Sequence, residues 1–124
     1  METNVKMTRD EYLKFHKNMC DKARQLSEKK NADYAGDKGL QPFANFERCE
    51  HMGITSTEKG FLVRLTDKFS RLSTFSDTGK FQVTDEGFYD TCLDIINYIC
   101  LMSAYLKSKD CLDENCCNDE QCGL

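Results

Sequence analysis

The sequence predicts an all-helical fold, and three observations support this prediction. Proline occurs once, at Pro42. β-branched residues are too scattered to form strands. Apolar residues instead recur at steps of three and four along three long segments, which is the spacing of a buried helix face. We therefore expect three long helices and one short helix, with the second and third long helices forming an antiparallel hairpin at the core.

The chain of 124 residues is long enough for one hydrophobic core. We expect a single helical domain over residues 1–109 and a flexible, cysteine-rich tail over residues 110–124. The tail contains the unit Cys-x-Asp-Glu-x-Cys twice, from Cys111 and from Cys117. Four thiolates could bind a soft metal, but adjacent cysteines fit zinc spacing poorly, which favours a redox-sensitive tail.

The first helix should begin at Thr8, because Glu11 stands three residues later and completes a capping box. It should fade near Asn31. Its apolar residues lie on one face, which we expect to be buried: Tyr12, Phe15, Met19, Ala23 and Leu26.

The glycine-containing segment 33–41 is expected to be a loop, and a short helix should follow over residues 44–51. Gly53 would close it. The second long helix should run from Ser56 or Thr57 to about Phe75, with this core face: Phe61, Leu62, Leu65, Phe69, Leu72 and Phe75. After a turn over residues 76–80, the third long helix should run from Thr84 to about Lys107.

The net charge of −4 argues against broad binding to nucleic acid or to a membrane, since both require a basic surface. The N-terminal residues are charged and lack the apolar segment of a signal peptide. We therefore expect a cytoplasmic protein, in the host cytoplasm if the chain is viral. Most of the eight cysteines lie in helical patterns or in the tail, which suits a reducing compartment.

The third long helix is apolar nearly all round, which places it inside the domain. It nevertheless carries one polar line at steps of four, four and three: Glu86, Asp90, Asp94 and Asn97. Carboxylates beside so much apolar surface are costly unless they are paired or bind a metal.

The second long helix offers partners for this line: Arg64, Lys68 and Arg71, with Asp67 beside them. In an antiparallel hairpin, Arg64 would face Asp94, Lys68 would face Asp90, and Arg71 would face Glu86. Such a ladder can simply fix the register of two helices. It can also form a site in which carboxylates hold magnesium and the basic groups hold phosphate. The spacing alone favours the structural ladder.

Four stretches carry a recognisable set of motifs: Lys30-Asn-Ala-Asp33-Tyr34; Asn45-Phe46; Arg64-x-x-Asp67-Lys68-x-x-Arg71; and Asp85-Glu86-x-x-x-Asp90-Thr91-x-x-Asp94-x-x-Asn97-Tyr98. Together they resemble the nucleotide-modification-associated domain family, type one, over about residues 24–105. That resemblance implies a helical phage or viral protein acting on nucleotides connected with modified DNA bases. The chain is more distantly similar to the all-helical nucleoside triphosphate pyrophosphatases of the MazG and dimeric dUTPase group, which implies magnesium dependence and a possible homodimer.

These resemblances imply a magnesium-dependent nucleotide phosphohydrolase. Metal ligands would be Glu86, Asp90 and Asp94, which with Asp67 are also the candidate catalytic residues. Candidate nucleotide-binding residues are Asp33, Tyr34, Asn45, Arg64, Lys68, Arg71, Asn97 and Tyr98. Phe43 and Phe46 are expected to be core residues. A nucleotide-binding protein without catalysis is one alternative, and an interaction module with a structural charge ladder is another.

Overall fold

The computed structural model describes residues 6–34, 41–79 and 86–110, and at residues 31–34, 86 and 110 it describes the backbone alone. Within these ranges the chain forms four helices and no strand: α1 (Arg9–Tyr34), α2 (Ala44–His51), α3 (Thr57–Thr78) and α4 (Glu86–Asp110). The prediction of an all-helical fold with three long helices and one short helix is confirmed. The predicted tail lies outside the described residues.

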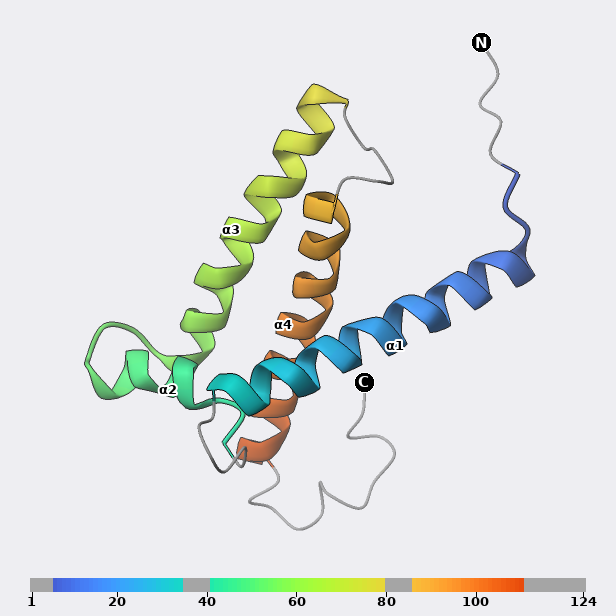
Figure 1. Ribbon diagram of the computed structural model, residues 1–124. Helices are drawn as coiled ribbons and strands as arrows, with labels where there is room; N and C mark the ends of the chain where they lie inside the picture. The colour runs from blue at the N-terminus through green and yellow to red at the C-terminus, as the bar shows by residue number, and fades with distance from the viewer. Residues whose placement is uncertain (1–5, 35–40, 80–85, 111–124) are drawn as a thin grey trace.

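Helix α4 is the centre of the fold. It forms an antiparallel hairpin with α3, as predicted, and α1 crosses it obliquely (Figure 1). The short α2 packs against α3. The N-terminal half of α1 extends beyond α4 (Figure 1). Over the described ranges, none of the helices combines the length and the apolar character that crossing a membrane requires.

Local hydrogen bonds explain where the helices begin. Thr8 and Glu11 form the predicted capping box, in which each backbone N–H donates to the other side chain at 3.1 Å. At the start of α3, the Ser56 hydroxyl accepts from the backbone N–H of Lys59 at 3.2 Å. Each cap satisfies donors that the first helical turn leaves unpaired.

The helix ends lie slightly beyond the predicted positions. Helix α1 continues to Tyr34 and α4 to Asp110. Helix α3 passes Phe75 and ends at Thr78, and the residue that caps it, Gly79, has a φ of 67° in the left-handed region. A glycine adopts this conformation without a steric penalty, and its N–H returns to the carbonyl of Phe75 at 3.0 Å.

The core is densest where α2, α3 and α4 meet. The rings of Phe46 and Phe61 stack with their centroids 4.1 Å apart, and the centroids of the Tyr105 and Phe61 rings are 5.9 Å apart. Phe61 and Leu93 are fully buried. The prediction that Phe46 is a core residue is therefore confirmed.

The predicted core faces of α1 and α3 are wider than the observed ones. Tyr12 and Phe15 are about half exposed, because they lie on the part of α1 that extends beyond α4. Leu62 and Phe69 on α3 are also about half exposed. The apolar stripe of each helix is broader than the surface that its neighbours cover, so these four predictions of burial were wrong.

Candidate binding pocket

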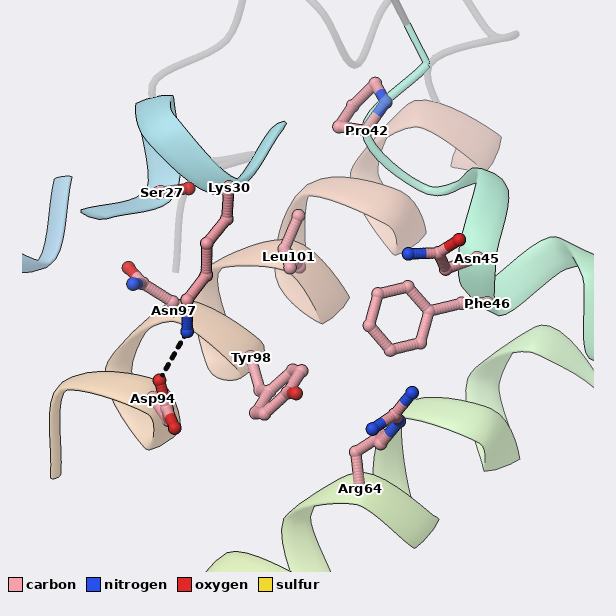
Figure 2. A pocket seen from close by; sticks show the side chains of 10 residues that line it. All are labelled: Ser27, Lys30, Pro42, Asn45, Phe46, Arg64, Asp94, Asn97, Tyr98 and Leu101. Atoms are coloured by element: carbon pink, nitrogen blue, oxygen red, sulfur yellow. Dashed lines mark hydrogen bonds and ion pairs between the residues drawn. The ribbon is translucent and has the colours of Figure 1, made fainter. Parts of the chain in front are cut away.

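A pocket opens where α1, the α2 segment, α3 and α4 come together (Figure 2). The enclosed cavity is about 140 Å³, which is smaller than the roughly 300–1,000 Å³ of typical small-molecule sites, and it is open to solvent at its mouth. Its polar lining residues are Ser27, Lys30, Asn45, Arg64, Asp94 and Asn97. Its apolar wall consists of Pro42, Phe46, Tyr98 and Leu101.

The carboxylate of Asp94 joins three helices at one side of this pocket. The Lys30 ammonium on α1 donates to Asp94 Oδ1 at 2.9 Å. The Lys68 ammonium on α3 lies 3.1 Å from Asp94 Oδ2. Each carboxylate oxygen therefore has its own lysine, and the pair from Lys30 is visible in Figure 2.

This ion-pair cluster is only partly accessible to solvent. The side chains of Asp94 and Lys68 are 18% and 13% exposed, whereas that of Lys30 is 46% exposed. Burial alone would raise the pKa of the Asp94 carboxyl, but hydrogen bonds from Lys30 and Lys68 outweigh burial and hold that pKa below its ordinary value. Asp94 is therefore ionised at neutral pH.

Arg64 supplies a further cation to the pocket. It lies one helical turn before Lys68 on α3 and reaches towards the ring of Phe46 (Figure 2). It forms no ion pair with any carboxylate in the described part of the chain. A guanidinium with its donors directed into a pocket suits the oxygens of a carboxylate or a phosphate.

Asn97 adds a buried hydrogen-bond donor to the pocket. Its Nδ2 atom is buried and finds no acceptor among the described residues. A buried polar group without a partner costs free energy, and most such groups in proteins are satisfied. Because Asn97 lines the pocket, an acceptor on a bound ligand would remove this cost.

The apolar wall is built from the core itself. One side of Phe46 stacks on Phe61, and the ring also meets Tyr98 edge to face, with centroids 6.0 Å apart and planes at 87°. The pocket therefore has a rigid aromatic boundary on one side. Planar or apolar parts of a ligand could pack against it.

The structure gathers some of the predicted site residues and separates others. Five of the candidates line the pocket: Asn45, Arg64, Asp94, Asn97 and Tyr98. Lys68 lies beside them, bound to Asp94. Arg71 and Asp67 instead pair with each other at 3.6 Å on the exposed surface of α3.

Four candidate residues cannot be assigned to this site. Asp90 is exposed and is not a lining residue of the pocket. The side chains of Asp33, Tyr34 and Glu86 lie outside the described residues.

The observed register of the α3–α4 hairpin differs from the predicted one by about one turn. We expected Lys68 to face Asp90, but it pairs with Asp94. Arg64, expected opposite Asp94, lines the same pocket without pairing with it. At the other end of the hairpin, Phe75 meets Phe88 edge to face at 5.4 Å. The length of the connection between two helices does not fix their register. Side-chain contacts between the helices, such as the one between Phe75 and Phe88, do fix it.

Sequence reasoning gave Lys30 no role in the site, although it is the residue that brings α1 into it. In the sequence, Lys30 is only the first residue of a motif. It follows Lys29, and nothing in the sequence distinguishes which of the two faces inwards. Ser27, one turn earlier on α1, also lines the pocket and was not predicted. Ser27 and Lys30 are recognised as lining residues only from the way α1 crosses α4.

The predicted magnesium site stays a prediction, and of its three ligands only Asp90 and Asp94 have side chains among the described residues. Both oxygens of Asp94 are occupied by lysine ammonium groups, which would repel a bound cation. No group of three potential ligands suited to a metal occurs in ranges 6–34, 41–79 and 86–110. The role of Glu86 as a ligand stays a prediction.

Comparisons of the chain with protein-family models, with curated proteins and with solved structures found no match.

Proposed function

We propose that this protein binds a nucleotide in the pocket between its four helices. The observation that carries the proposal is the convergence of three features in one cavity: the cations Arg64 and Lys30, the buried donor of Asn97, which finds no acceptor among the described residues, and an aromatic wall. A nucleotide presents matching chemistry, because it joins an anionic phosphate to a planar base with several hydrogen-bond acceptors.

Each part of the pocket has a role in this proposal. Arg64 holds the phosphate oxygens, and Lys30 contributes positive charge from the opposite side of the pocket (Figure 2). Asn97 donates to an acceptor on the base or the sugar, and Asn45 lies across the pocket from it (Figure 2). The base packs against the wall formed with Tyr98.

The position of the motif residues supports the same proposal. The residues that carry the family resemblance are spread along the chain from Lys30 to Tyr98. Seven of them line one pocket: Lys30, Asn45, Phe46, Arg64, Asp94, Asn97 and Tyr98. A purely structural charge ladder would not require the asparagines and aromatic residues to meet at the same place.

The geometry supports binding better than hydrolysis. Asp94 is the one carboxylate among the described residues that line the pocket, and both of its oxygens hold lysines. A general base must have an oxygen available to accept a proton from water. We therefore assign binding without catalysis as the leading function.

Isothermal titration with the four common deoxynucleoside 5′-monophosphates and their triphosphates tests the proposal. Replacing Arg64 with alanine should weaken binding by about tenfold or more, since charge-assisted hydrogen bonds to phosphate are lost. Arg48→Ala provides the matched control, because Arg48 is exposed on α2 and does not line the pocket. The nucleotide affinity of Arg48→Ala should stay within about twofold of that of the wild type. Equal affinities for the wild type and Arg64→Ala, or no binding at all, would refute the proposal.

A further inference from the structure

The charged side chains in and beside the pocket include more cations than anions. Lys30 and Arg64 line the pocket and Lys68 lies beside it, and the one carboxylate of this group, Asp94, pairs with Lys30 and Lys68 but not with Arg64. If all four groups are ionised, the cluster carries two net positive charges. This count determines how much negative charge a ligand can bring before like charges repel each other.

The position of the negative charge is fixed. Asp94 is held from two sides by Lys30 on α1 and Lys68 on α3, and its side chain is only 18% exposed. Moving the carboxylate away would break both ion pairs and leave charges partly buried without partners. An incoming anion therefore meets Asp94 as a permanent part of the site.

We infer that Asp94 limits the ligand to one carrying a single phosphate monoester, so that the site takes nucleoside monophosphates in preference to triphosphates. A phosphate monoester carries about 1.5 to 2 negative charges at neutral pH, which matches the surplus of the cluster. Among the described residues that line the pocket, Lys30 and Arg64 are the cations, so the additional phosphates of a triphosphate would meet no further lining cation and would add negative charge to a site that already holds Asp94. This inference rests on the proposed nucleotide site and adds the class of ligand.

The test compares the affinities of deoxynucleoside monophosphates and triphosphates for the wild type and two variants. The wild type should bind monophosphates at least about tenfold more tightly. Asp94→Asn keeps the shape of the side chain but raises the surplus charge to three, so the preference for monophosphates should fall by about tenfold. Asp21→Asn is the matched control, because Asp21 pairs with Lys17 on the exposed surface of α1, outside the pocket. It should leave the preference unchanged.

A second variant, Lys30→Met, tests the same inference if Asp94→Asn does not fold. Lys30→Met alters a side chain that is 46% exposed and lowers the surplus charge to one. It should weaken monophosphate binding and increase the preference for monophosphates over triphosphates, which is the opposite direction from Asp94→Asn. A wild type that prefers triphosphates, or variants that shift the preference in the same direction, would overturn the inference while leaving nucleotide binding intact. Binding of no nucleotide by the wild type would overturn the proposed function as well.

Discussion

Replacing Phe61 with alanine is the most informative test of the packing. Phe61 is fully buried on α3, stacked on Phe46 at 4.1 Å and in contact with Tyr105 at 5.9 Å. Removing its ring takes away contacts with both α2 and α4 and leaves a cavity. The free energy of unfolding should fall by about 3–5 kcal/mol, a large part of the stability of a small domain.

The assay is urea denaturation of the reduced protein, followed by circular dichroism. Phe69→Ala is the matched control, because Phe69 lies on the same helix two turns later and is 52% exposed, compared with 0% for Phe61. Since about half of its surface is already in water, the control should cost only about 1 kcal/mol. The difference between the two variants, rather than either value alone, measures the packing of Phe61.

Equal losses for the two variants would refute this account of the core. If the loss at Phe69 was large in concentrated protein and shrank on dilution, a second copy would be covering that face of α3. Such a result would support the predicted homodimer, because the stability of a dimer depends on its concentration. A loss at Phe69 that did not depend on concentration would instead mean that the chain itself buries this residue.

Three further predictions concern acid stability, capping and metal dependence. Lys30 and Lys68 hold the pKa of the Asp94 carboxyl low against the effect of burial. The contribution of Asp94 to stability is therefore complete above the ordinary pKa of 3.8, and it is lost as the pH falls through that value and the folded-state pKa. In urea unfolding at a series of pH values, the stability of Asp94→Asn should fall less steeply with acid than that of the wild type, and an equal slope would contradict this. Ser56→Ala should cost about 1 kcal/mol in the same assay, because the cap on Lys59 is lost, whereas Ser56→Asp should retain most of the stability. Removal of magnesium with a chelator should change nucleotide affinity by less than about twofold, since both oxygens of Asp94 are already paired with lysine ammonium groups. If nucleotide binding required magnesium, the hydrolase hypothesis would be restored.

The fold was largely predictable because its signals are local. The capping box at Thr8, the short helix over residues 44–51 and the start of α3 at Ser56 depend on residues within one turn of each other. Helix ends were less accurate, since α1 and α4 run about three residues further than expected. The end of α3 at Thr78 is marked by the left-handed backbone of Gly79.

The candidate site was only partly predictable because its geometry depends on contacts between helices. The polar line on α4 correctly indicated Asp94 and Asn97, since a carboxylate on an apolar helix requires a partner. The identity of the partners did not follow. Lys68 pairs with Asp94 because of the hairpin register, and Lys30 reaches it because α1 crosses α4. Neither the register nor the crossing leaves a periodic signal in the sequence.

The placement of Lys30 and Ser27 on α1 couples ligand affinity to the docking of that helix. The N-terminal half of α1 extends beyond α4, so its attachment depends on contacts of its C-terminal half, including buried Ala23 and the Lys30–Asp94 ion pair. If α1 detaches, one wall of the pocket leaves with it, and the measured affinity falls in proportion to the detached fraction. By the same linkage, a nucleotide bound as we propose would hold α1 in place and slow hydrogen exchange along it. The concentration of ligand in the cell would then regulate how long this helix stays protected from proteases.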